Sequence, residues 1–267
     1  MAEIWGLKVV DPAKGEIGGV HVSIIAVWTA VMLAVTAIPA YPVPGMAGVI
    51  TVAVILSTLT GALLGPIAGL LFGLVFSTLE IMLFPYTAFF GILTILCPTA
   101  NAFVAGLVVH DRWKEASAIY VLILAIWFAH DYGRYQLMPI IPILQWVPPL
   151  IFILVPQIRY FIIKSIAERD VKKLPIAFLL LQNIGYMAEN AVGCDIWLWW
   201  AGWSFPYIYW VGTTAYHVAV HWITAIIGGI VATPIWITLK KIRVKTFGDI
   251  LEKKYLVEEA EEESEGE

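Results

Sequence analysis

Two histidines one helical turn apart, His217 and His221, form the pair in this sequence best suited to chemistry. Residues four apart lie on one face of an α-helix, and two imidazoles so placed can bind a metal ion with Glu80 or Glu189 as a third ligand. The glutamate that follows the first histidine in zinc peptidase helices is missing, because Val218 stands there. A histidine pair hydrogen-bonded across helices explains the spacing more simply. We therefore expect no metal and no other cofactor.

Further polar side chains stand within or at the ends of long apolar segments. An ionised group at mid-membrane costs about 2.5 kcal/mol or more, so such a group normally faces a cavity, a partner or water. We expect several of these residues, together with neighbouring aromatic rings, to bind a solute, because ligand pockets combine apolar walls with a few polar groups. Acids outnumber the single arginine among them, which favours a cationic or hydrogen-bond-donating solute. The expected binding residues are Glu80, Arg134, Glu189, His217, His221, Trp200, Trp203 and Tyr216.

Two features qualify this expected site. Asn101, Gln182 and Asn183 lie deeper in their apolar segments and are expected to form its floor. The aromatic residues of the stretch 196–210 have an alternative explanation, since Trp and Tyr also form belts at the membrane interface. We expect that stretch to lie on the outer interface or to dip into it.

The composition places all of these residues in a membrane. The chain has 267 residues, 60% of them apolar and 13% charged, and its mean hydropathy is +0.85. These values exclude a soluble domain with a charged surface. Because a membrane-crossing helix needs about 20 apolar residues, we expect an all-α integral membrane protein, a polytopic helical bundle of about eight transmembrane helices. The expected spans are 20–39, 47–64, 66–84, 87–109, 116–131, 138–158, 174–191 and 213–239.

The basic residues orient this bundle. Of the 16 Lys and Arg residues, all except Arg134 fall in four clusters that are separated by even numbers of expected spans. All four clusters therefore lie on one side, and basic loops favour the cytoplasm. Both termini are expected to be cytoplasmic, and nearly all of the membrane-embedded polar residues face outward. The clusters are Lys8 and Lys14; Arg112 and Lys114; Arg159, Lys164, Arg169, Lys172 and Lys173; and Lys240, Lys241, Arg243, Lys245, Lys253 and Lys254.

Three parts are expected along the chain. Residues 1–19 form a cytoplasmic segment, 20–240 the transmembrane domain, and 241–267 a basic and then acidic cytoplasmic tail. The last ten residues contain seven glutamates and no aromatic group. Such a composition buries too little apolar surface to fold, so we expect the end of the tail to be disordered.

Small residues recur at four-residue spacing in two places, a pattern that allows close approach of helices in lipid. The first expected span carries a ridge of Ala26, Ala30 and Ala34. Glycines continue the pattern on both sides of the turn at Pro66. They are Gly61, Gly65, Gly69 and Gly73.

The N-terminal third resembles the membrane-embedded substrate-binding (S) components of energy-coupling-factor (ECF) transporters. The resemblance rests on the alanine ridge, on the Pro-rich outer loop IPAYPVPGMAG (residues 38–48), and on the segment LLGPIAGLLFGLVFSTLE, in which Gly65-Pro66 starts the third span. It covers residues 20–109. The chain differs from the family in its number of spans, about eight where the family usually has six. A six-helix core like that of the family is compatible with this number.

The resemblance implies a role for each of these parts. The ridge of Ala26, Ala30 and Ala34 would dock onto a transmembrane coupling subunit that recruits two cytosolic ATPases. The outer loop would cover a pocket, open to the outside, that holds a vitamin or similar nutrient. We therefore expect a substrate-capture subunit of a small-solute importer in the plasma membrane, which relies on partners for ATP because the chain has no nucleotide-binding motif.

Two alternatives stay open at this point. A metal-dependent intramembrane enzyme would use His217 and His221. A self-contained secondary transporter or a structural membrane subunit would need no ATPase partner, although the halves of the sequence show no convincing repeat of the kind that many such transporters carry.

Overall fold

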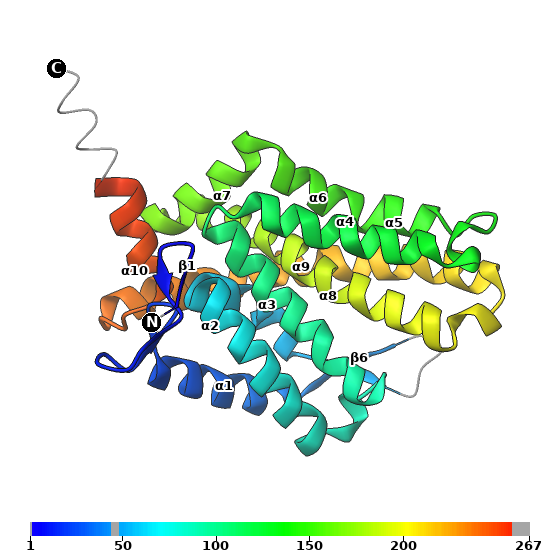
Figure 1. The fold of residues 1–267 in the computed structure, drawn as a ribbon, viewed down its shortest axis with the longest axis horizontal. Helices are drawn as coiled ribbons and strands as arrows, with labels where there is room; N and C mark the ends of the chain where they lie inside the picture. The colour runs from blue at the N-terminus through cyan, green and yellow to red at the C-terminus, as the bar shows by residue number, and fades with distance from the viewer. Residues whose placement is uncertain (1, 44–47, 258–267) are drawn as a thin grey trace.

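A computed structural model describes residues 2–43 and 48–257 and shows a bundle of α-helices preceded by short β-hairpins (Figure 1). The N-terminus and the last helix, α10, lie at the same end of the bundle. The helices are α1 (Val22–Thr36), α2 (Ala53–Leu83), α3 (Leu96–Val109), α4 (Trp113–Ala129), α5 (Ile140–Gln145), α6 (Val147–Leu154), α7 (Pro156–Glu168), α8 (Leu174–Trp200), α9 (Tyr207–Lys241) and α10 (Phe247–Glu252).

The strands are short and antiparallel. Five of them build the N-terminal segment, and two form a hairpin between α1 and α2. They are β1 (Glu3–Ile4), β2 (Leu7–Lys8), β3 (Val10–Asp11), β4 (Glu16–Ile17), β5 (Val20–His21), β6 (Pro39–Pro42) and β7 (Val49–Thr51).

Several helices have the length and composition of membrane spans. In the described part of the chain, Leu59–Leu83, Gly91–Val109 and Tyr207–Lys241 are each long and apolar enough to cross a bilayer. The pair α6 and α7 meets the same criteria together, with a bend of 77° between the two helices. The expected helical architecture is confirmed, and the length and composition of these helices support a membrane protein. The count of eight crossings stays a prediction.

The break expected at Gly65-Pro66 lies inside α2. Gly65 has φ +67° and ψ −170°, a conformation that only glycine adopts readily, and the proline after it cannot continue the hydrogen bonding of the preceding helix. The two arms of α2 therefore run in opposite directions along α3: the first arm is parallel to it and the second antiparallel. The facing pairs are Ser57 with Asn101, Gly61 with Ala105, Gly69 with Ala102 and Gly73 with Thr99.

Proline and glycine also explain where the helices differ from the expected spans. The expected span 87–109 becomes helical only at Leu96, after 3₁₀ turns at Pro85–Thr87 and Gly91–Ile95. The expected span 138–158 is divided among α5, α6 and α7, because its prolines interrupt the backbone hydrogen bonds. The interrupting prolines are Pro139, Pro142, Pro148, Pro149 and Pro156.

The last two long helices extend beyond the spans expected at 174–191 and 213–239. Most of the aromatic stretch 196–210 belongs to the final turn of α8 and the first turn of α9, joined by a 3₁₀ turn at Gly202–Ser204. The indole of Trp210 is buried and donates a hydrogen bond of 3.0 Å to the carbonyl of Gly202. This contact packs the start of α9 against the turn that precedes it.

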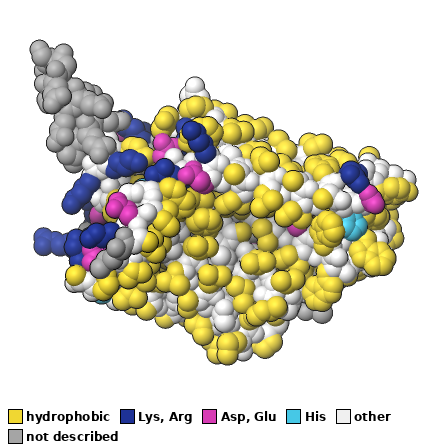
Figure 2. Space-filling view, in the orientation of Figure 1, with side chains coloured by type: hydrophobic (Ala, Val, Ile, Leu, Met, Phe, Trp, Pro, Cys, Tyr) yellow, Lys and Arg dark blue, Asp and Glu magenta, His cyan; other side chains and the backbone are white. Residues whose placement is uncertain are grey.

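The basic clusters meet at one end of the molecule, which we call the basic end. Figure 2 shows Lys and Arg side chains gathered around α10 and the N-terminal strands, and hydrophobic side chains along the flank of the bundle. Lys245 binds Glu16 across 2.7 Å, and the Arg112 guanidinium lies 5.9 Å from the ring centre of Trp5. Charges far apart in sequence thus share one face.

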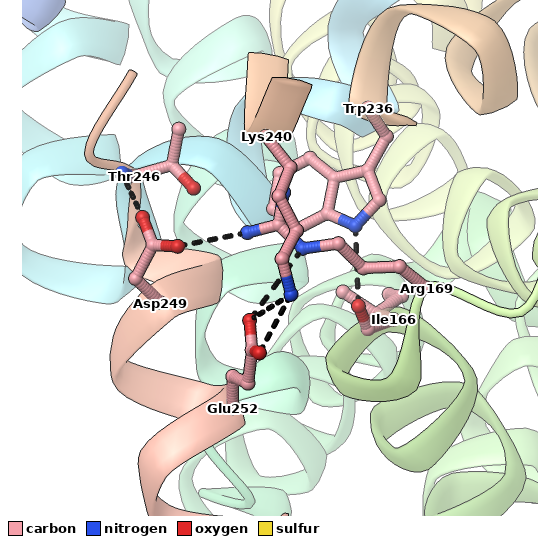
Figure 3. A network of polar contacts seen from close by, with 7 residues as sticks. All are labelled: Ile166, Arg169, Trp236, Lys240, Thr246, Asp249 and Glu252. Atoms are coloured by element: carbon pink, nitrogen blue, oxygen red, sulfur yellow. Dashed lines mark hydrogen bonds and ion pairs between the residues drawn. The ribbon is translucent and has the colours of Figure 1, made fainter. Parts of the chain in front are cut away.

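A buried arginine fixes α10 to this end (Figure 3). The side chain of Arg169, only 5% exposed, lies 3.0 Å from Asp249 and 3.9 Å from Glu252. Its guanidinium also lies 5.0 Å from the ring centre of Trp236 on α9. The segment 241–257, expected as part of a tail, therefore includes a docked helix, while residues 258–267 of the acidic tail lie outside the described residues.

Candidate functional site

The main cavity lies between the later half of α8 and the first half of α9, in the part of the bundle remote from α10. Its volume is about 130 Å³. A single water needs roughly 15 Å³ of such space, so the cavity can hold a molecule of several heavy atoms. Four of the expected binding residues line it: Glu189, Tyr216, His217 and His221.

Glu189 is held by a polar floor. The Asn101 amide donates hydrogen bonds of 2.7 Å to Oε2 of Glu189 and 2.9 Å to the Ser57 hydroxyl. Below them, Gln182 donates to the carbonyl of Val54 at 2.7 Å. Asn101 and Gln182 are fully buried, and they lie beneath the cavity rather than in its wall. The floor expected from the sequence therefore includes the group that orients Glu189.

The two histidines pack through their rings. Their ring centres lie 5.8 Å apart, and the ring of His221 meets that of Tyr186 edge to face at 4.6 Å. Nδ1 of the buried His221 has no hydrogen-bond partner in the structure. Within residues 2–43 and 48–257, no group of three or more His, Cys, Asp and Glu side chains is arranged to hold a metal ion.

The hairpin of β6 and β7 covers the main cavity. The Tyr41 hydroxyl on β6 lies 2.5 Å from the Tyr186 hydroxyl on α8, and the Tyr216 hydroxyl on α9 donates to the carbonyl of Pro42 at 3.4 Å. Tyr41, Val43 and Ile50 all line the cavity. The described part of the outer loop thus lies where the resemblance places a cover, and residues 44–47 of that loop lie outside the described residues.

Glu80 faces a second space, which we call the side cavity. It has a volume of about 70 Å³ and shares Glu189, Ile50, Phe89 and Cys97 with the main cavity. Glu80 is only 7% exposed. Two carboxyl side chains that are far apart in sequence therefore lie in adjoining spaces.

Three of the expected binding residues lie away from both cavities. The side chain of Arg134 is 56% exposed and forms an ion pair with Asp131. Trp200 and Trp203 are 57% and 58% exposed, because Trp200 ends α8 and Trp203 lies in the following turn, beyond the cavity. Their exposure fits the alternative explanation, a belt of aromatic residues at the membrane interface.

Other residues, three of them aromatic, supply the walls instead: Tyr41, Phe89, Tyr186 and Gln145. Tyr186 precedes Glu189 by three residues, so helical spacing alone could have placed both on one face. Tyr41 stands in the Pro-rich loop that the resemblance predicts as a cover, which is a further signal. Phe89 and Gln145 give no such signal, since the first follows a helix and the second lies among prolines. All four line the main cavity.

The alanine ridge lies on the outside of the bundle. Ala26, Ala30 and Ala34 are exposed on α1, whereas Trp28 and Met32 on the opposite face are buried. The three alanines present a smooth strip of helix to the surroundings. This strip is available for another helix to pack against.

Comparisons with known proteins agree with part of this picture. Residues 19–132 match the family model described as ECF-type riboflavin transporter, S component. An uncharacterized protein of Methanocaldococcus jannaschii is 26% identical over 138 residues, which are 52% of this chain and 45% of the relative. The chain thus matches less than half the length of this curated relative, and no solved structure matches. The resemblance predicted for residues 20–109 is confirmed: the segment 19–132 is similar to the S components of ECF-type riboflavin transporters.

Proposed function

We propose that this protein is the substrate-capture subunit of an ATP-driven importer for a small solute. The main cavity carries the proposal, because it combines aromatic walls, a carboxyl group oriented by Asn101, and a cover formed by the β6–β7 hairpin. Such a combination is typical of sites that enclose small molecules. The similarity of residues 19–132 to transporter S components supports the same role.

The orientation follows from charge. The basic end faces the cytoplasm by the positive-inside rule, which places both termini inside. The chain then crosses the plasma membrane about eight times, with the two arms of α2 counted separately. The main cavity lies in the opposite half of the bundle, and a solute enters it from outside.

Transport requires partners in this proposal. The exposed strip of Ala26, Ala30 and Ala34 docks onto a transmembrane coupling subunit, since small side chains let two helices approach closely in lipid. That subunit recruits cytosolic ATPases to the basic end. A vitamin or similar nutrient is the proposed solute class.

Native mass spectrometry of protein purified from its own membranes tests the proposal. We expect a small molecule bound to the wild-type protein and absent from a variant in which Gly193→Leu fills the cavity, where a Cβ would lie 3.2 Å from the ring of Phe90. Gly212→Leu is the control, because a Cβ at that position would have nothing within 4 Å. Equal occupancy in all three proteins, or no small molecule in any of them, would contradict the proposal.

A further inference from the structure

The described wall of the main cavity contains an acidic side chain without a basic partner. Glu189 is the one carboxyl group in its described lining, which contains no Lys or Arg. Arg134, the base expected there, is instead paired with Asp131 outside the cavity. Asn101 donates to one oxygen of Glu189 but brings no charge. An ionised carboxylate within a membrane normally faces a cavity, a partner or water, and the described lining supplies no Lys or Arg as a partner.

The histidines do not supply this partner either. Among the described residues, no Lys, Arg or His nitrogen forms an ion pair with Glu189. His221 is 4% exposed, and its ring packs against the edge of Tyr186. A protonated His221 ring would be buried away from water with no anion bonded to it, which is costly. A positive group on the solute is therefore the complement that this wall lacks.

A second polar residue in the lining also lacks a partner. Gln145 is 2% exposed, lines the main cavity, and has no hydrogen-bond partner for Oε1. Buried carbonyl oxygens are normally hydrogen-bonded, because an unmade bond is costly. A second hydrogen-bond donor on the solute would meet this oxygen or the free nitrogen of His221.

The remaining wall favours a flat ring. Phe90 and Trp197 both line the cavity, with ring centres 6.4 Å apart and planes inclined at 44°. Tyr186 and Trp210 are further aromatic residues in the lining. Aromatic faces attract both other aromatic rings and cations. A ring with a delocalised positive charge would use both attractions at once.

We propose that the solute is an aromatic cation with at least one hydrogen-bond donor, bound with its positive group beside Glu189 and its ring between aromatic walls. This inference rests on the proposed solute-capture function and narrows it to one chemical class. It excludes anionic solutes, since the described lining contains no Lys or Arg side chain to bind them.

Three pyridine derivatives of matched size test the charge preference. They are ring-N-methylated nicotinamide, a cation; nicotinamide, which is neutral; and nicotinate, an anion. Binding of each radiolabelled probe to the protein in lipid nanodiscs is measured by equilibrium dialysis, with empty nanodiscs as background. We expect the cation to bind about ten-fold more tightly than the neutral probe, because its ring charge is attracted to the Glu189 carboxylate, and the anion to bind least.

Variants assign this preference to one side chain. Glu189→Gln should reduce binding of the cation to the level of nicotinamide, and Glu189→Asp should retain part of the preference. Asp131→Asn is the matched control, because it removes the same charge from a side chain that is 96% exposed and outside the cavity. It should leave all three affinities unchanged. Gln145→Leu covers the case in which Glu189→Gln does not fold. It removes the second acceptor from the lining and should still weaken binding of the cation.

The outcomes separate this inference from the proposed function. A preference for the neutral or anionic probe, or a cation preference that survives Glu189→Gln, would overturn the solute class while leaving solute capture intact. If none of the probes binds, the charge of the molecule found by native mass spectrometry decides: a cation supports the class, and a neutral molecule or an anion overturns it. The absence of any bound molecule and of probe binding would overturn both.

Discussion

Asn101 donates to only one of the two carboxylate oxygens of Glu189, and this single contact shows how individual residues prepare the cavity. The amide is fully buried and also donates to Ser57, so its position is fixed from two sides. Side chains held by such supporting hydrogen bonds lose little freedom when a ligand arrives. At the residue scale, the site is therefore set by a small number of polar contacts between helices that are distant in sequence.

The hydroxyl pair of Tyr41 and Tyr186 leads to a prediction about solute release. Tyr41→Phe removes one of the two hydroxyls, which lie 2.5 Å apart, and so loosens the cover. A hydrogen bond of this kind contributes about 1 kcal/mol, so the solute should dissociate about five-fold faster. Stopped-flow measurement of solute release provides the check. Tyr160→Phe, an exposed tyrosine on α7, should change nothing; a cover that plays no part in retention would give equal rates in both variants.

His110, just beyond the end of α3, gives a prediction for pH. Burial lowers the pKa of His110 below its ordinary value of 6.5. Its Nε2 lies 3.1 Å from the carbonyl of Trp5, and Nδ1 has no partner. The neutral ring donates through Nε2, and protonation would add a proton to the unpartnered Nδ1.

Because the folded state disfavours protonation, the stabilisation by His110 is present above pH 6.5 and is lost as the pH falls through the lowered folded pKa. The melting temperature of the wild-type protein should fall more between pH 7.5 and about pH 5 than that of His110→Gln. Scanning fluorimetry at a series of pH values compares the two. Parallel curves for both proteins would show that His110 does not contribute.

At the scale of elements, the elbow in α2 organises the core. Gly65 reverses the chain between two helical arms, and both arms pack on α3. A Cβ at Gly65 would lie 2.5 Å from the ring of Phe247 on α10, and one at Gly106 would lie 2.6 Å from the backbone of Gly65. The elbow, the end of α3 and α10 therefore meet where side chains have no spare room.

Gly65→Ala should lower the melting temperature strongly, because the new methyl group adds both backbone strain and a clash. Gly91→Ala is a control for positive φ without a clash: Gly91 has φ +55°, and a Cβ added there would have nothing within 4 Å. Strain alone costs roughly 1 kcal/mol. We expect Gly65→Ala to be clearly more destabilising than Gly91→Ala in a thermal unfolding assay. Equal losses of stability in the two variants would mean that the Phe247 ring moves away from the new methyl group at little cost.

The sequence predicted those elements whose boundaries depend on local chemistry. Gly65-Pro66 indicated a turn, and the turn is present. Phe89 and Gln145 reach the main cavity only through tertiary packing, which no local pattern encodes. The bend between α6 and α7 could not be predicted locally either. A proline marks where a helix is interrupted but not the direction of the segment that follows.

Side chains near helix ends were the least predictable part of the site. Arg134 and Trp200 are expected just outside the spans and Tyr216 just inside one, a difference in depth too small to separate them. The structure separates them by position around and along the helices: Tyr216 lines the cavity, whereas the other two are exposed outside it. The supporting floor could be predicted in part. The Asn101 amide finds partners, as buried amides normally do, whereas the amide of Asn183, expected beside it, is buried without a partner in the structure.

The whole molecule has two chemically different ends. Ion pairs and a buried arginine join the basic clusters at one end, while the aromatic cavity lies in the other half. The exposed alanines lie on α1, which runs along the flank of the bundle from the N-terminal strands (Figure 1). This arrangement suits a subunit that receives a solute on one side and contacts its partners through the helix flank and the basic end.

Ala30→Leu tests the partner surface. Ala30 is exposed, so a larger side chain should leave folding and solute binding unchanged while it prevents close approach of a second helix. Co-purification of the coupling subunit and ATPases should be lost. Val121→Leu, a change at an exposed site on α4, serves as the control. An assembly that survives Ala30→Leu would place the docking surface elsewhere.

The most direct test of the account is an experimental structure of the protein purified with its own solute in lipid nanodiscs. The account predicts non-protein density in the main cavity, within hydrogen-bond distance of Glu189 and beneath Tyr41. Density for the solute at any other place, with this cavity empty, would contradict it.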